Sequence, residues 1–278
     1  MSSATAFQPS APSLTSNDSA VLQALFDAES SPSAGITIDP RLPALPSYLN
    51  ISPKEHESLQ AREKEIITPL QSPQTPPETI RSAIRDLDTL IATHPTYPSA
   101  YANRAQALRM LIEPSNQQSP AFPLRGSEST SPKSSSSSSS SAAFFAAENA
   151  DHLTTLLADL GQAIELSSPG SFAGSVSTLQ ARTLADSHTH RGYILLKMAR
   201  QLKGEGGGER GGADGCVIPE RFRESGPDQL EEMASRDFFL GGRYGNKMAQ
   251  QLAVQTNPYA KMCGAIVKEA LRKEIEGQ

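Results

Sequence analysis

Stretches with the apolar spacing of helices alternate along this 278-residue chain with stretches dominated by Pro, Ser and Gly. Residues 101–111, YANRAQALRML, have the alternation of small and large side chains that is typical of one helix in a packed helix pair. The residues that follow are rich in Pro, Gln and Ser and include the serine run from Ser134 to Ser141. Such a tract cannot bury enough apolar surface to offset the entropy of ordering it. We therefore predict a helical fold whose helix partners are separated in sequence by disordered inserts.

The same contrast in composition predicts the domain organisation. Residues 1–16 are predicted to be a disordered tail, 17–29 a short docking helix and 30–53 a Pro-rich linker. Residues 54–278 are predicted to form one folded domain, which disordered inserts interrupt at 113–142 and 203–227. No segment shows the alternation of a strand, so the expected fold class is all-α.

The predicted helices fall into three pairs that share a spacing of small and large residues. In the second pair, residues 101–108 fit the first helix of a tetratricopeptide repeat and residues 156–163 fit the second. The helices of the first pair match near residues 58–66 and 83–95, and those of the third near 188–195 and 234–241. Small residues at shared places allow neighbouring helices to approach closely: Ala83, Ala105, Ala163, Gly192 and Gly241. We predict a short TPR-like helical solenoid, with C-terminal capping helices at 249–256 and 257–278.

Charge and apolar patterning exclude several classes of partner. A formal net charge of -5 argues against a protein that works mainly by neutralising nucleic-acid phosphates or anionic lipid. No apolar run reaches the length of a membrane span, and the first residues lack the order of a signal peptide. Cys216 and Cys263 suit a reducing compartment, although a bridge between them stays open. We expect a cytoplasmic or nuclear chain whose partners are proteins, with no nucleic-acid or membrane partner.

Three patterns that suggest chemistry have simpler explanations. His188 and His190 are two residues apart on a predicted helix and so point to nearly opposite sides, which disfavours a shared metal ion. The Gly-rich stretch after residue 203 lacks the Lys and Ser or Thr of a phosphate-binding loop. Cys263 lies on an inward-facing helical stripe, where a thiol is inert. We predict a protein that is not an enzyme, with no catalytic, cofactor or metal site.

Several segments together resemble one family of small repeat proteins. They are NDSAVLQALFD, AYANRAQALR, LADLGQAIEL, HRGYILLKMAR, SRDFFLGGRYGNKMAQQLA and NPYAKMC. The combination is similar to the tetratricopeptide repeat protein 36 family, whose members have three repeats. The resemblance implies binding to an Hsp70-type chaperone and a role in tyrosine catabolism through 4-hydroxyphenylpyruvate dioxygenase. The Pro-rich turn before Glu78, the Ser tract and the Gly-rich linker depart from the family pattern.

The resemblance also allows a comparison with repeat proteins that grip the C-terminal carboxylates of a chaperone. Asn103 matches the Asn of the second repeat in that clamp. The first-repeat places fall near Ser58 and Arg62, and the third-repeat places fall near Asp186 and His190. Because an Asp repels a carboxylate, we expect any chaperone to bind differently. The predicted partner-binding groove uses Arg62, Asn103, Arg104 and Arg191.

Three classes of function follow from these observations. The favoured one is a protein-binding scaffold or co-chaperone-like adaptor, because stacked helix pairs form a concave surface for a partner segment. The alternative is a structural assembly factor of a larger cytoplasmic complex. An enzyme that uses Cys263 or the histidines ranks last.

Overall fold

The computed structural model describes residues 36–72, 74–113, 144–169, 174–204, 218–257 and 272, and it is mostly helical. The main helices are α2 (Pro53–Ile67), α3 (Pro77–Thr93), α4 (Pro98–Ile112), α6 (Ala150–Ser167), α7 (Thr178–Leu202), α8 (Glu220–Arg243) and α9 (Lys247–Thr256). Short 3-10 helices are η1 (Ser47–Leu49), η2 (Thr68–Gln71) and η4 (Ala147–Asn149), and β1 (Thr37–Ile38) pairs with β2 (Ser175–Val176). The predicted all-α class is therefore confirmed.

Some predicted features lie outside the described residues. They are the tail 1–16, the docking helix 17–29 and, apart from Asn257 and Arg272, the capping helix 257–278. The same holds for Cys216 and Cys263.

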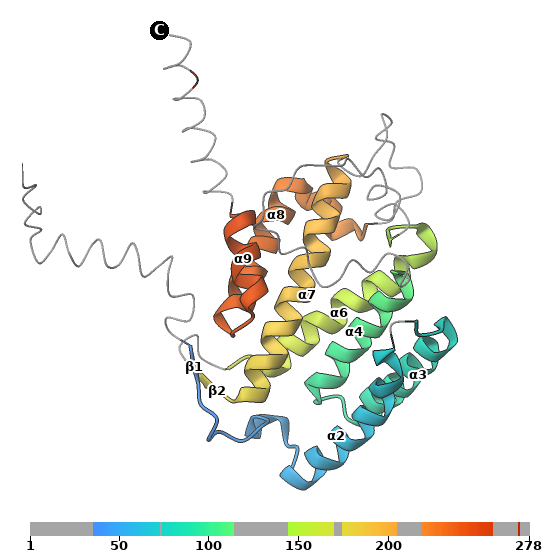
Figure 1. The fold of residues 1–278 in the computed structure, drawn as a ribbon, viewed down its shortest axis with the longest axis vertical. Coiled ribbons are helices and arrows are strands. Elements are labelled where there is room, and N and C mark those ends of the chain that lie inside the picture. The colour runs from blue at the N-terminus through green and yellow to red at the C-terminus, as the bar shows by residue number, and fades with distance from the viewer. Residues whose placement is uncertain are drawn as a thin grey trace, which may run out of the picture.

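The helices lie in chain order through the described part of the molecule (Figure 1). From α3 to α9, each helix packs against the one before it. Helices α2 and α3 lie at one end of this row, and α8 and α9 lie at the other. A row of this kind places helices of different predicted pairs side by side.

Local sequence signals set where the helices begin. Ser52 and Ser177 each form a capping box, in which the serine side chain accepts a hydrogen bond from the third helical amide. In turn, the side chains of Glu55 and Gln180 accept a hydrogen bond from the backbone amide of the capping serine. Proline at the first position starts α2, α3 and α4. These signals place the observed starts at Pro53, Pro77, Pro98 and Thr178.

Two clusters of buried apolar residues form the core. The larger one joins α4, α6, α7, α8 and α9, and the smaller one joins α2, α3 and the start of α4 to the segment before α2. The apolar stripe predicted for α6 is buried, except that Ile164 is only partly so. In α3, Leu90 is 2 % exposed and belongs to the smaller cluster, and Ile91 beside it is partly buried against the same cluster. Burial of these stripes is the main favourable contribution to folding.

The Pro-rich segment predicted as a linker at 30–53 is packed over its described part, which starts at Ile36. Leu45 and Leu49 are 7 % and 3 % exposed and belong to the smaller core cluster. The Tyr48 hydroxyl lies 2.9 Å from the carbonyl oxygens of Leu166 and Ser168, at the end of α6. Leucines between the prolines bury enough surface to hold the segment in place. The prediction of a linker from Pro-rich composition is therefore wrong for this part of the chain.

The insert predicted at 203–227 is also shorter than expected. Lys203 pairs with Asp228 at 2.9 Å, and α8 begins at Glu220, with Phe222 buried. The helix bends at Gly226, whose φ of 73° suits glycine and whose successor is a proline. The bend explains the error, since Gly-Pro reads as a helix boundary. Of the insert 113–142, only Glu113 is described, and Lys197 binds it.

Two glycines occupy the close helix contacts that the repeat pattern predicts. A Cβ at Gly192 would lie 3.0 Å from the Phe238 ring and 3.1 Å from the Ala234 carbonyl oxygen. A Cβ at Gly241 would lie 2.6 Å from the Thr189 hydroxyl. Both positions therefore require glycine, because α7 and α8 are already in contact there.

Candidate functional site

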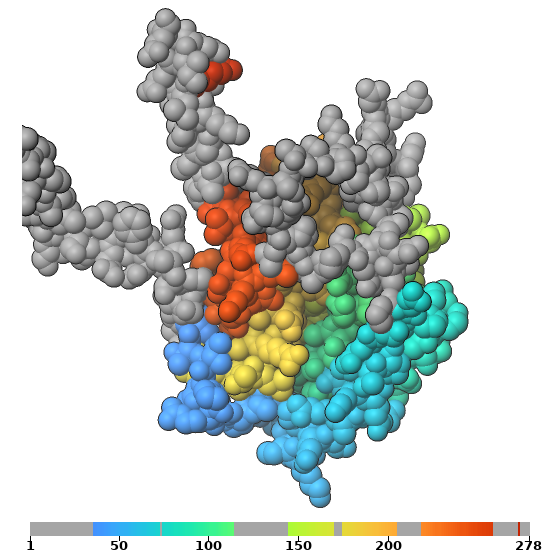
Figure 2. Space-filling view, viewed as in Figure 1, coloured from blue at the N-terminus to red at the C-terminus, as the bar shows by residue number. Residues whose placement is uncertain are grey.

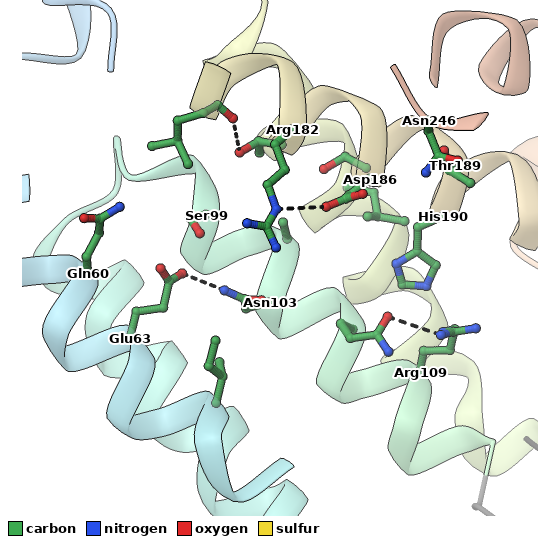
Figure 3. A pocket seen from close by; sticks show the side chains of 17 residues that line it. Gln60, Glu63, Ser99, Asn103, Arg109, Arg182, Asp186, Thr189, His190 and Asn246 are labelled. Carbon is green, nitrogen blue, oxygen red and sulfur yellow. Dashed lines mark hydrogen bonds and ion pairs between the residues drawn. The ribbon is translucent and has the colours of Figure 1, made fainter. Parts of the chain in front are cut away.

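A groove of about 510 Å³ opens between α2, α4 and α7, the first helices of the three predicted pairs. In the space-filling view the surfaces of these helices share one face of the molecule (Figure 2). The close-up shows the side chains that converge on the groove (Figure 3). Its lining from α2 is Gln60, Glu63 and Ile67, and its lining from α4 is Ser99, Ala102, Asn103, Gln106 and Arg109. The remaining lining is Leu160, Leu179, Arg182, Thr183, Asp186, Ser187, Thr189, His190 and Asn246.

Glu63 fixes the wall between α2 and α4. Its carboxylate accepts a 2.8 Å hydrogen bond from the Tyr97 hydroxyl and a 2.7 Å bond from the Asn103 side-chain amide. Burial and the neighbouring Glu63 charge raise the pKa of Tyr97, so this hydroxyl stays protonated and remains a donor. The contacts hold Asn103 in one orientation, with its carbonyl oxygen available to accept a bond.

The inner end of the groove carries polar atoms that have no hydrogen-bond partner among the described residues. They are the Nε of Arg109, the hydroxyl of Ser187 and the Nε2 of His190, all shielded from solvent. Burial, followed by the positive charge of Arg109, lowers the pKa of His190 to about 3. His190 is therefore neutral at physiological pH. Since a buried polar atom without a partner is costly, this end of the groove suits a ligand that supplies hydrogen bonds.

The outer part of the groove carries balanced charge. Arg182 and Asp186 of α7 face each other at 3.9 Å, with side chains 82 % and 63 % exposed. Together with Glu63 and Arg109 they give two positive and two negative groups. The amides of Gln60, Gln106, Asn103 and Asn246 can each donate and accept. Neutral balance and many amides match a peptide backbone better than a strongly charged ligand.

Outside the groove, two arginines form the same ion pair in successive helix pairs. Arg104 of α4 donates to both carboxylate oxygens of Asp159 in α6, at 2.8 and 2.6 Å. Arg191 of α7 donates to both oxygens of Asp237 in α8, at 2.7 and 2.8 Å. Bidentate pairs of this kind are strong and geometrically specific. Each one ties the first helix of a pair to the second.

Comparison with known proteins establishes the family. No family model and no solved structure matches the chain. A curated protein of Aspergillus fumigatus, "L-tyrosine degradation gene cluster protein hmgX", is 61% identical over 277 residues. The match covers 100% of this chain and 99% of that protein. The chain belongs to the hmgX family.

In this hmgX family member, the predicted groove residues separate into different places. Asn103 lines the groove, whereas Arg62 is exposed on α2 and is not part of the lining. Arg104 and Arg191 are engaged in their ion pairs, and Arg104 also binds Asp88 at 2.6 Å. Neither arginine lines the groove, and their guanidinium groups hold helices together, so contact of these two residues with a partner stays a prediction.

The places that correspond to a carboxylate clamp are poorly suited to one in this hmgX family member. Asp186 and the neutral His190 line the groove at the third-repeat places. Ser58 and Arg62, at the first-repeat places, lie outside the lining. That a carboxylate tail would need another mode of binding stays a prediction.

The sequence analysis missed most of the groove residues on α7. Leu179, Arg182, Thr183, Asp186, Ser187 and His190 recur every three or four residues and so share one face of the helix. This helical spacing could have predicted the groove lining, because it places polar residues of α7 on one face, next to the buried apolar stripe of the same helix. Glu63 and Arg109 were missed as well, because a charge on a helix face is usually solvated.

The two histidines of the His-Thr-His stretch lie on opposite sides of α7, as the helical spacing predicts. His188 bonds to Asp237 at 2.8 Å, between α7 and α8, and His190 lines the groove. Within the described residues, no group of three His, Cys, Asp or Glu side chains is arranged to hold a metal ion. None of the described helices combines the length and apolar character needed to cross a membrane.

Proposed function

We propose that the described helices form a short TPR-like solenoid whose concave groove binds a segment of a partner protein. The support is the repetition of one arrangement. Residues Tyr101-x2-Arg104-Ala105 and His188-x2-Arg191-Gly192 occupy equivalent places in the first helices of two pairs. Their arginines bind Asp159 and Asp237, each of which precedes a buried apolar residue in the second helix. Recurrence of both spacing and contact is expected of a structural repeat.

The groove between α2, α4 and α7 is the observation that carries the proposed binding function. In a helical-pair stack, the first helices line the concave surface, and this surface accepts extended peptides or helices. The Nε of Arg109, the hydroxyl of Ser187 and the Nε2 of His190 have no hydrogen-bond partner among the described residues, and the amides around them suit a polypeptide. We propose an adaptor that is not an enzyme and needs no cofactor.

The proposed biological context is tyrosine catabolism. The relative from A. fumigatus is named for an L-tyrosine degradation gene cluster. We propose that this chain acts in the same process through a protein partner in the cytoplasm or nucleus. The candidates are 4-hydroxyphenylpyruvate dioxygenase and an Hsp70-type chaperone, which the resemblance to the tetratricopeptide repeat protein 36 family implies. A chaperone would contact the groove without relying on a carboxylate clamp.

The test is affinity capture of the tagged full-length chain from cells growing on tyrosine, with mass-spectrometric identification of bound proteins. The groove variant is the exchange Arg182→Asp/Asp186→Arg, which preserves the ion pair and reverses its direction. A matched control is Glu78→Arg/Arg81→Glu, an exchange at an exposed pair on α3 that lies outside the groove. Neither exchange changes the net charge.

The proposal expects the dioxygenase or the chaperone to be enriched with the wild type and with the α3 control, and to fall at least fivefold with the groove variant. Equal capture by all three chains would show that the groove is not the binding surface. If neither candidate is captured and no other tyrosine-pathway protein is captured instead, the adaptor function is rejected.

A further inference from the structure

A second hollow, of about 750 Å³, lies between α6, α7 and both arms of the bent helix α8. The bend at Gly226 turns the first arm so that Arg221, Phe222 and Ser225 face the same space as residues of the second arm. The second arm contributes Met233, Arg236, Asp237 and Leu240, and the floor is formed by Leu157, Ala158, Gly161, Gln162, Glu165, Arg191 and Leu195. This hollow shares no lining residue with the groove of α2, α4 and α7.

Gly161 indicates that the floor of this hollow is open for a reason other than packing. Glycine inside a helix is less favourable than alanine, and at Gly192 and Gly241 close neighbours explain it. At Gly161, in the middle of α6, an added Cβ would meet nothing within 4 Å. No contact within the described part of the chain therefore requires the glycine. It leaves backbone accessible to a segment that enters the hollow.

Arginines outnumber carboxylates in the lining of the hollow, where Arg191, Arg221 and Arg236 stand against Glu165 and Asp237, in contrast to the chain as a whole. Arg221 and Arg236 are exposed and form no ion pair within the described part of the chain. The Arg221 guanidinium lies 4.5 Å from the centre of the Phe222 ring. Apolar lining is supplied by Leu157, Leu195, Met233 and Leu240. The chemistry fits an acidic segment that carries an apolar helical stripe.

One segment of this chain has that chemistry. Residues 17–29, NDSAVLQALFDAE, carry three acidic side chains and no Lys or Arg, and their apolar residues follow helical spacing. We propose that residues 17–29 of the same chain bind in the hollow between α6 and the two arms of α8, with their acidic groups near Arg221 and Arg236. The groove would then remain available for a partner.

The connection is long enough for this placement. The described chain begins at Ile36, and Ile38 lines a shallow depression with Tyr244 and Gly245 at the C-terminal end of α8. Leu240, one turn earlier in α8, already belongs to the hollow. Residues 30–35 span up to about 20 Å when extended. Along α8, the distance from Tyr244 back to Arg236 is about 12 Å.

The test uses full-length chains and a fluorescein-labelled peptide with the sequence of residues 17–29. The receptor is Leu22→Asp/Leu25→Asp, which removes the apolar face of the segment, and Leu14→Asp in the preceding tail is its control. The proposal expects the peptide to bind the Leu22/Leu25 variant at least tenfold more tightly than the wild type or the Leu14 variant, in which the hollow is occupied.

Charge reversal then locates the site. In the Leu22/Leu25 background, Arg221→Glu/Arg236→Glu should weaken peptide binding at least tenfold, and Gly161→Leu should do the same by filling the floor. Arg200→Glu/Arg223→Glu reverses two exposed arginines outside the lining and should leave binding unchanged. Circular dichroism checks that each receptor is folded.

Three results would overturn the proposal. The first is equal peptide binding by wild type and the Leu22/Leu25 variant. The second is insensitivity to reversal of Arg221 and Arg236. The third is a wild-type dimer in sedimentation that dissociates in the Leu22/Leu25 variant, since the segment would then bind a second copy instead of its own chain.

Discussion

The second and third helix pairs share an Arg–Asp ion pair but surround it differently. Arg104 binds Asp159 of its own pair and also reaches Asp88 of α3, so it links two successive pairs. Among the described residues Arg191 pairs with Asp237 alone, and Asp237 accepts a further hydrogen bond from His188. One contact thus connects the stack, and the other stabilises a single unit. A repeated contact can keep its geometry while its neighbours change its role.

The carboxylates reflect this difference. Burial raises the pKa of Asp159 even though Arg104 opposes it. Burial acts in the same direction on Asp237, but the hydrogen bonds from Arg191 and His188 outweigh it and hold the pKa of Asp237 below its usual value. The additional donor in the third pair therefore favours the charged carboxylate.

The first pair lacks this contact. Asp86, which precedes the buried Leu87 as Asp159 and Asp237 precede Leu160 and Phe238, is exposed and forms no ion pair among the described residues. Glu63 of α2 is turned to the groove by the hydrogen bonds that it accepts from Tyr97 and Asn103. The first pair therefore contributes more to the groove wall and less to the internal ties of the stack.

The largest effect is expected for Asp237→Ala. Removal of this carboxylate leaves His188 and most of Arg191 buried without their acceptor, which should lower the free energy of unfolding by about 3–5 kcal/mol. Urea denaturation measures the change. Asp86→Ala, the equivalent exposed position, serves as the control and should stay within about 0.5 kcal/mol. Similar losses for the two variants would contradict the assigned roles.

A smaller loss is expected for Asp159→Ala, because Arg104 retains Asp88 as a partner. We expect about 2–3 kcal/mol, measured in the same way. In the double-mutant cycle with Asp88→Ala, the two losses should not be additive, since both carboxylates share one guanidinium. Additive losses would show that Arg104 does not connect the two pairs.

His190, on the groove face of α7, makes stability depend on pH. His190 has a folded pKa of about 3, so its contribution to stability is complete above pH 6.5 and is lost as the pH falls towards 3. Between pH 7 and pH 5, this loss amounts to up to about 2 kcal/mol. His190→Gln should remove that part of the pH dependence in urea titrations. An unchanged pH profile would mean that His190 is accessible to protonation.

The smallest effect separates glycines that pack from the one that does not. Gly161→Ala should stabilise the protein by about 1 kcal/mol, because it improves helix propensity and meets no neighbour. Gly192→Ala should destabilise it by about 1–3 kcal/mol, because the new methyl group contacts Phe238. Thermal denaturation of both variants decides the matter. A loss of stability at Gly161 would reveal a contact that the described residues do not show.

The sequence predicted helices and their burial well because both depend on local spacing. The starts of α2 and α7 follow from Ser52 and Ser177, and the α6 stripe follows from its leucines. The prediction failed at Leu45, where a Pro-rich composition suggested a linker, and at Phe222, which precedes a Gly-Pro pair. At both places a few apolar side chains hold the chain against the core. The sequence did not indicate that Arg104 and Arg191 pair with Asp159 and Asp237, because residue type alone does not show which of two helix faces carries the acceptor.

The central claim is that the groove of α2, α4 and α7 binds the partner. Hydrogen exchange with mass spectrometry, on the full-length chain alone and in the captured complex, measures this most directly. The account predicts slower exchange on binding in residues 60–67, 99–109 and 179–190, with little change in the second arm of α8. Protection confined to α6 and α8, with the groove helices unchanged, would contradict it.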